Sequence, residues 1–219
     1  MELLRVVDKL GNDTNEIIER EELHNRGKLH NEVTIYIVND KGEVLLQRRS
    51  KNRRFCPNKL GVIAGHQSYR EDILTCAVRE TKEEVGLKIK KDDLHPLCDK
   101  YLVEEKYNNH YMYPYYVICN QKAEDFTIQK EELSFVRWYK IEEVIRLIEV
   151  GSKEIVFKKD EIRLFKKLLE VTKKDEKESF FLKIKKLLNA VDNQKTNEID
   201  AGTTADIANA YDFKIEPAE

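Results

Sequence analysis

Three glutamates lie close together in the segment Arg79–Glu84, which reads RETKEE. On an α-helix, Glu80, Glu83 and Glu84 occupy positions i, i+3 and i+4, so their carboxylates share one face. Acids on adjacent turns repel one another unless a cation lies among them. Carboxylate oxygens suit a hard divalent cation such as Mg²⁺ or Mn²⁺, which also binds phosphate oxygens. The spacing therefore predicts a metal site that serves a phosphate-containing substrate.

The helix that carries these acids also has an apolar side, so it can bury one face and direct acids from another. The residues on the apolar side are Leu74, Ala77, Val78 and Val85. An ordinary solvated helix face is the alternative, because 37% of the chain is charged. The residues around the helix distinguish the two interpretations.

The surrounding segment Gly65–Leu87 has a fixed order of residues, G-x5-E-x7-R-E-x-x-E-E-x-G followed by an aliphatic residue. The positions are filled by Gly65, Glu71, Arg79, Glu80, Glu83, Glu84, Gly86 and Leu87. This order resembles the Nudix box, and eight fixed positions over 23 residues are a specific signal. One position departs from the family, because Thr81 stands where an aliphatic residue is usual; we expect its methyl group to pack there.

The resemblance implies a metal-dependent pyrophosphohydrolase that acts on acid anhydrides in phosphorus-containing compounds. The expected substrate is a small molecule, a nucleoside diphosphate derivative or a related diphosphate. Glu80 and Glu84 are expected to bind Mg²⁺ or Mn²⁺, with Glu83 as a further ligand or as a partner that orients water. The expected catalytic residues are Glu83, Glu84, Arg79 and Glu71, and the last two support the helix by pairing.

Motifs ahead of the box narrow the resemblance to the isopentenyl-diphosphate-isomerase-like branch of the Nudix superfamily. The segments VVDKLGN, REELHNRGKLH, NDKGEVLLQRRS and AGHQ carry this likeness over residues 1–140. True isomerases use a cysteine just before the Gly-His pair, and they hold a metal partly through histidines. This chain has Ala64 at the cysteine position, and alanine cannot transfer a proton.

A second departure from the isomerases lies further along the chain. Isomerases carry an acidic pair shortly before a proline, whereas residues 108–114 read NNHYMYP. Isomerase activity is therefore the disfavoured alternative, and we expect His66 to support its neighbours or to pack. His24 and His30 are expected to be hydrogen-bonded structural residues. A nucleotide-binding Nudix module without turnover is another alternative.

The general base varies across the superfamily and sometimes lies in a distal loop. Candidates here are Glu131 and Glu132, just before a strand expected over Phe135–Tyr139, or Glu104 and Glu105. Candidates for contact with a substrate phosphate are Arg48 and Arg49 and the basic segment that follows them, residues 51–54.

The resemblance implies an α/β (α+β) Nudix fold with a mixed β-sheet between helices, and the pattern of apolar residues predicts its individual elements and a helical C-terminal extension. The predicted elements are a hairpin over Glu2–Ile18, strands over Val33–Val38, Val44–Gln47, Pro96–Val103, Tyr111–Cys119 and Phe135–Tyr139, and helices over Ile141–Val150 and Asp160–Val171. We expect residues 1–171 to form the Nudix domain. Residues 172–219 would then form a charged linker, an amphipathic helix and a polar tail.

Composition limits the partners and the compartment. The net charge of −2 gives no reason to expect nucleic acid as a bulk partner, and no apolar run is long enough to span a membrane. The four cysteines lack CxxC spacing, which favours reduced thiols and a cytoplasmic protein. The amphipathic helix is expected to pack on its own domain or across a homodimer, with a membrane surface or a protein partner as alternatives.

Overall fold

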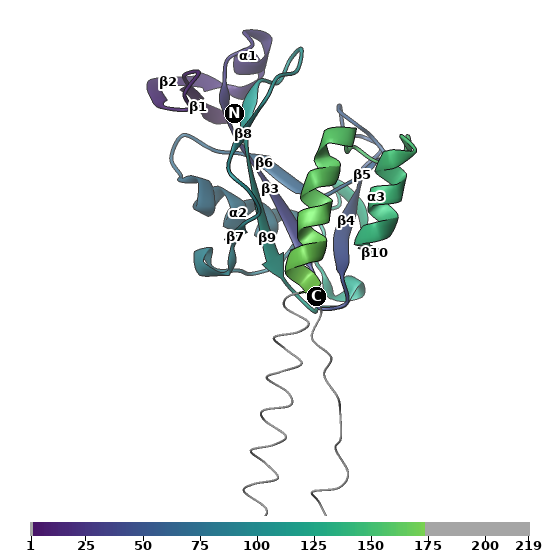
Figure 1. Ribbon diagram of the computed structural model, residues 1–219. Helices are drawn as coiled ribbons and strands as arrows, with labels where there is room; N and C mark the ends of the chain where they lie inside the picture. The colour runs from purple at the N-terminus through teal and green to yellow at the C-terminus, as the bar shows by residue number, and fades with distance from the viewer. Residues whose placement is uncertain (1, 174–219) are drawn as a thin grey trace, which may run out of the picture. The chain divides into compact units, whose positions relative to one another are not determined.

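A mixed sheet runs through the middle of the fold, with helices on both of its faces (Figure 1). The structure is a computed structural model that describes residues 2–173. Its strands are β1 (Leu3–Val7), β2 (Asp13–Glu19), β3 (His30–Val38), β4 (Glu43–Arg49), β5 (Leu60–Gly61), β6 (Ile63–His66), β7 (His95–Pro96), β8 (Tyr101–Val103), β9 (His110–Ile118) and β10 (Leu133–Lys140). Its helices are α1 (Arg20–Asn25), α2 (Ile73–Val85), α3 (Ile141–Glu149) and residues 162–173, with short 3₁₀ turns η1 (Lys91–Asp93), η2 (Ala123–Asp125) and η3 (Lys159–Glu161).

The main sheet has the order β10-β4-β3-β9-β7. In addition, β5 pairs with β4, β6 pairs with β3, and β8 pairs with β9. The strands β3 and β9 run parallel, and the other pairs are antiparallel. The predicted mixed sheet between helices is therefore confirmed.

The central strand β3 is buried on both faces. Its alternate residues point to opposite sides of the sheet, and each set packs in a different core cluster. Ile35 and Ile37 belong to a core cluster that includes residues of α2. Tyr36 and Val38 belong to a second cluster, which includes residues of α3 and of the helix over 162–173. The sheet thus separates two apolar cores, one beneath each helical layer.

The N-terminal segment forms the predicted hairpin, in which β1 and β2 are antiparallel. A small core of its own holds it together, formed by Leu4, Val6, Ile18 and Leu23 of α1. The hairpin joins the rest of the fold through backbone hydrogen bonds, since the Val7 N–H donates to the Leu29 carbonyl. These contacts place α1 beside the start of β3.

Local contacts define both ends of the helix α2. The Asp72 carboxylate accepts a hydrogen bond from the Thr75 N–H at 2.8 Å, which caps the N-terminus. Gly86 ends the helix in the left-handed conformation with φ of 71°, which glycine adopts without steric cost. Thr81 is fully buried, and its hydroxyl donates to the Ala77 carbonyl at 2.7 Å, so the polar group is satisfied.

The predicted single strand over Pro96–Val103 is wrong, because the segment forms two short strands. Both pair with β9, but Pro96 lies opposite Tyr115 whereas Tyr101 lies opposite Met112. Between these two pairs the segment advances by five residues while β9 advances by three. The two extra residues therefore interrupt the pairing with β9. Leu97, between the two strands, is fully buried in the core cluster that includes Tyr36.

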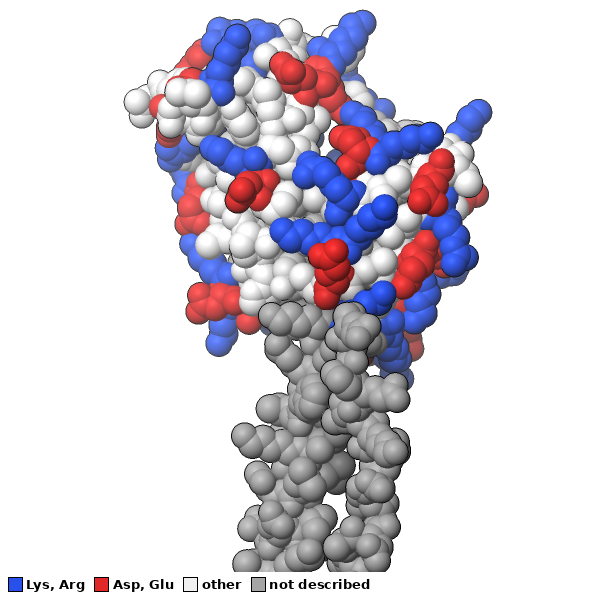
Figure 2. Space-filling model, in the orientation of Figure 1, with Lys and Arg blue, Asp and Glu red and all other residues white. Residues whose placement is uncertain are grey.

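The helix over residues 162–173 continues to the last described residue, beyond the predicted end at residue 171. The predicted amphipathic helix and polar tail lie outside the described residues. Within residues 2–173, no helix is both long and apolar enough to cross a membrane. Lys and Arg side chains are interspersed with Asp and Glu over the face that Figure 2 shows, as the small net charge leads one to expect.

Candidate active site

Arg79 gathers three of the predicted carboxylates around one guanidinium group. It donates to both oxygens of Glu71, from Nη2 at 2.7 Å and from Nε at 3.1 Å. Its Nη1 donates to Glu80 at 2.7 Å and to Glu83 at 3.0 Å. Two parallel bonds to one carboxylate fix the plane of the guanidinium as well as its position. The structure therefore brings together the predicted residues Glu71, Arg79, Glu80 and Glu83.

Glu80 is held against the end of β6, next to Gly65. A Cβ atom added at Gly65 would lie 2.0 Å from Cδ of Glu80, so only glycine leaves room for this carboxylate. Burial raises the pKa of Glu80 to about 7, although Arg79 opposes the shift. Glu83, by contrast, is half exposed on the open side of the helix.

Glu84 is the most buried carboxylate of the group, with 5% of its surface exposed. Its Oε2 is buried and has no hydrogen-bond partner among the described residues. Burial raises the pKa of Glu84 well above its usual value, and the charges of Glu80 and Glu132 act in the same direction. Unpartnered buried carboxylate oxygens are costly, and a divalent cation with oxygen ligands would satisfy them. The residues therefore fit the Mg²⁺ or Mn²⁺ site that the sequence predicts.

The two arginines at the end of β4 have different surroundings. Burial lowers the pKa of Arg49, while the neighbouring carboxylates of Glu84 and Glu132 oppose the shift, so Arg49 lies close to the carboxylate group. Arg48 stacks over the Phe135 ring at 5.4 Å and lies 4.0 Å from Glu154. These partners of Arg48 are therefore residues outside the carboxylate group.

The four candidate general bases have different surroundings in the structure. Glu132 lies close enough to raise the pKa of Glu84, and it pairs with Arg53 at 2.8 Å. Glu105 pairs instead with Lys158, and Glu104 and Glu131 are exposed. Of these four residues, Glu132 is the one that the structure brings toward Glu84.

A recess of about 510 Å³ opens beside Arg79. The residues that line it are Glu2, Leu3, Ser68, Tyr69, Arg70 and Arg79. Arg70 stacks over the Tyr69 ring at 4.9 Å, which places a cation and an aromatic surface at the wall of this recess. A ligand held there would reach the guanidinium that organises the carboxylates.

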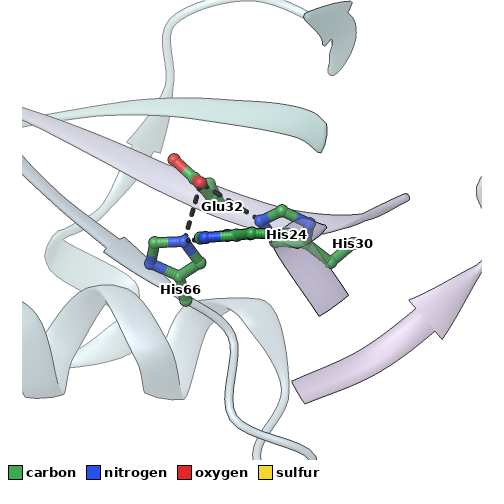
Figure 3. A group of neighbouring side chains, drawn as sticks. All are labelled: His24, His30, Glu32 and His66. Atoms are coloured by element: carbon green, nitrogen blue, oxygen red, sulfur yellow. Dashed lines mark hydrogen bonds and ion pairs between the residues drawn. The ribbon is translucent and has the colours of Figure 1, made fainter. Parts of the chain in front are cut away.

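Figure 3 shows a second group of chemically active side chains. It lies near the first, since Arg79 Nη2 donates to the carbonyl of its member His66 at 3.1 Å. We call it the histidine cluster, and its members are His24, His30, Glu32 and His66. Sequence analysis did not bring these residues together, although His30 and Glu32 are two residues apart and so share one face of a strand. The other two members come from α1 and from β6, where His66 pairs with Glu32 across the sheet. Burial lowers the pKa of His24 to about 4, and the neighbouring His66 and His30 add to this effect.

The chain matches the family described as NUDIX domain over residues 28–159. It is 32% identical over 149 residues to Nudix hydrolase 3 of Arabidopsis thaliana, which covers 63% of this chain and 19% of that protein. It is 30% identical over 129 residues to the Nudix hydrolase lmo0368 of Listeria monocytogenes, covering 58% of this chain and 72% of that one.

Two further likenesses concern the branch and the fold. An isopentenyl-diphosphate Delta-isomerase of Jannaschia is 35% identical over 78 residues, which are 35% of this chain and 44% of the isomerase. Among solved structures, the DR0079 protein of Deinococcus radiodurans superposes with a TM-score of 0.60 at 20% identity. That match covers 76% of this chain and 99% of the other, and it supports the fold.

Proposed function

Since this chain belongs to the NUDIX domain family, we propose that it is a metal-dependent pyrophosphohydrolase. The proposed reaction cleaves the diphosphate linkage of a nucleoside diphosphate derivative or a related small molecule. One observation carries the proposal: the buried, unpartnered Oε2 of Glu84 lies beside carboxylates that Arg79 has already oriented. An ordinary solvated helix face would leave such an oxygen in water.

Each residue of the group has a proposed role. Glu80 and Glu84, with Glu83, hold Mg²⁺ or Mn²⁺, which when bound neutralises phosphate charge and lowers the pKa of a bound water. Arg79 and Glu71 position Glu80, because the guanidinium bonds both carboxylates at once. The Glu84 oxygen that does not hold the metal accepts the proton of the attacking water, directly or through a second water.

The proposal also distinguishes between the two candidate phosphate ligands. We assign the substrate contact to Arg49, whose pKa reflects the nearby Glu84 and Glu132 carboxylates. Arg48 is occupied by the Phe135 ring and by the Asn58 carbonyl, to which its Nη1 donates. Glu132 remains the alternative base. To act as a base it has to give up its ion pair with Arg53.

The isomerase alternative has less support from the side chains present. Ala64 lies on β6 opposite Thr34, where its methyl group has no proton to transfer. Residues 108–114, the stretch comparable to the one that carries the acidic pair of the isomerases, contain no carboxylate. The likeness to the Jannaschia isomerase keeps this activity as the second candidate, so the test must include its substrate.

The test measures cleavage of nucleotides, nucleotide sugars, dinucleotides and prenyl diphosphates in Mg²⁺ and Mn²⁺. We expect metal-dependent release of a phosphate monoester, with kcat lower by about 100-fold or more in Glu84→Gln. The matched control is Glu142→Gln on the exposed side of α3, which should keep full activity. Conversion of isopentenyl diphosphate to its isomer would favour the second candidate. Metal binding without turnover of any compound would favour the binding module.

A further inference from the structure

Gln47 is a buried polar residue to which the proposed reaction gives no role. It lies in β4, with 2% of its surface exposed. Alternate residues of a strand share one face, so Leu45, Gln47 and Arg49 point to the same side of the sheet. Leu45 packs in the core cluster that includes residues of α2, and Arg49 lies close to Glu84. Gln47, between them on β4, therefore points toward the helix that carries the acids.

The orientation of the Gln47 amide is set by its nitrogen. Nε2 donates to the Val62 carbonyl at 2.8 Å, and a carbonyl oxygen can only accept a hydrogen bond. The reversed amide would place two acceptors against each other, so this contact decides which branch is the nitrogen. Oε1 is then the remaining polar atom of the side chain, and it is buried with no hydrogen-bond partner among the described residues.

Gln47 lies within hydrogen-bonding reach of Glu84. Burial raises the pKa of Glu84 well above its usual value, and a hydrogen bond from Gln47 is one of the effects that oppose this shift. The amide oxygen of Gln47 is bonded to the same carbon as the nitrogen, so it also lies near the Glu84 carboxylate. Glu84 Oε2 is a second buried oxygen here that has no partner within residues 2–173.

Two neighbouring buried oxygens of this kind require a donor that no described residue supplies. Leaving them unsatisfied is costly, because on burial each oxygen loses its hydrogen bonds to water. Neither the amide oxygen nor an ionised carboxylate has a proton to offer the other. A water molecule has two protons, so a single water can satisfy both oxygens at once.

We propose that Gln47 positions the attacking water by accepting one of its protons at Oε1 while Glu84 accepts the other. This inference rests on the proposed function, in which Glu84 takes a proton from that water. Only one proton leaves in the reaction, and the second stays on the attacking oxygen, where Gln47 holds it. Holding both O–H bonds fixes the direction of the oxygen lone pair that must face phosphorus.

The surroundings of Gln47 suit a positioning role. Its backbone is paired on both sides, with Val136 of β10 and with Gly61 of β5. Its amide is held by the Val62 carbonyl, directly before β6. A side chain that is fixed at its backbone and at its tip holds a ligand atom in one place without reorganising.

The alternative explanation is that Gln47 only packs and holds Glu84 through its nitrogen. In that case the amide oxygen has no function, and every side chain that lacks the Nε2 donor should behave alike. Two variants separate the explanations. Gln47→Met has nearly the shape of glutamine and no oxygen, whereas Gln47→Glu keeps an oxygen but, when ionised, cannot donate to the Val62 carbonyl.

The experiment first measures Mn²⁺ affinity in the full chain without substrate, by electron paramagnetic resonance of the free ion. It then measures kcat and KM with the best substrate of the panel. In Gln47→Met we expect kcat to fall about 10–100-fold, KM to change less than about threefold, and Mn²⁺ affinity to fall about 10-fold. In Gln47→Glu, at a pH of about 8.5, kcat and Mn²⁺ affinity should stay within about fivefold of the wild type.

Thr172→Val is the matched control, because it also replaces a buried polar side chain with an apolar one. Its hydroxyl donates to the Leu168 carbonyl at 3.0 Å, within the helix over residues 162–173. This variant should keep the wild-type kcat and Mn²⁺ affinity. Circular dichroism checks that each variant is folded. If Gln47→Met does not fold, Gln47→Asn replaces it with the same expectation, since its oxygen is one methylene further from Glu84.

Unchanged kcat and Mn²⁺ affinity in folded Gln47→Met would overturn the proposal, and so would equal losses in Gln47→Met and Gln47→Glu. A wild-type protein that cleaves no diphosphate would overturn the proposed function instead. The Mn²⁺ affinities of the variants would still decide whether the Gln47 oxygen supports the site.

Discussion

At the scale of single residues, the arrangement of the acids depends on the guanidinium group of Arg79 and on the absence of a side chain at Gly65. Arg79 bonds Glu71, Glu80 and Glu83. Its Nη2 also donates to the His66 carbonyl at 3.1 Å. The backbone of His66 therefore supports Arg79 while its ring belongs to the histidine cluster. The carboxylate group and the histidine cluster therefore meet at this residue.

Gly65→Ala tests whether the position of Glu80 matters for the reaction. The added methyl carbon would lie 2.0 Å from Glu80 Cδ, so the carboxylate must move. Because a displacement of about 1 Å in a catalytic group costs about 100-fold in rate, we expect a loss of that size in kcat. Kinetics with the best substrate of the panel measure it.

Gly42→Ala is the control, since nothing lies within 4 Å of its Cβ position. Its φ of +67° makes alanine cost about 1–2 kcal/mol of stability, with no change in kcat. If folded Gly65→Ala keeps the kcat of the wild type, the placement of Glu80 has no part in the reaction.

At the scale of elements, α2 is fixed at both ends, which sets the rotation of its acids. The Asp72 carboxylate caps the first turn, and its other oxygen accepts from the Thr75 hydroxyl at 2.9 Å. At the other end, Cβ at Gly86 would lie 2.8 Å from Cβ of Thr127, so the chain passes close to its neighbour there. The helix therefore has little freedom to turn Glu80 and Glu84 away from β6.

Asp72→Ala should destabilise the protein by about 1 kcal/mol, because the Thr75 N–H loses its cap. Urea unfolding measures this difference. Asp72→Asn keeps a capping oxygen and loses only the charge opposite Lys91, an exposed pair that contributes little. Equal destabilisation by both variants would show that the ion pair, and not the cap, holds this end of the helix.

At the scale of the whole molecule, the second core is completed late in the chain. Phe165, in the helix over residues 162–173, is fully buried and packs edge-on against Tyr36 of β3 and against Phe157. The helix layer opposite α2 therefore depends on residues beyond the matched family range of 28–159. The division at residue 171 into a Nudix domain and an extension stays a proposal.

Phe165→Ala should lower the free energy of unfolding by about 3–5 kcal/mol, because it leaves a cavity between two rings and the sheet. Denaturant titration gives the value. Val150→Ala, at a position that is 77% exposed, should change stability by less than about 0.5 kcal/mol. A similar small effect at Phe165 would mean that this helix layer adds little to the stability of the core.

The sequence alone determined the features that depend on local spacing. Glu80, Glu83 and Glu84 share a face of α2 because the helical repeat relates neighbours along the chain. Asp72 and Gly86 bound that helix for equally local reasons. The break between β7 and β8 escaped prediction, because it follows from their register against β9, which no local pattern records.

Only the tertiary structure decided which distant residues meet. Arg48 and Arg49 are adjacent in sequence, yet the strand turns them to opposite sides, and the sheet alone decides which side holds the acids. The histidine cluster depends on the pairing of β6 with β3 and on the hairpin that carries α1. Its members are separated by up to 42 positions, and their convergence arises from packing and register, which act between segments and leave no periodic trace in the sequence.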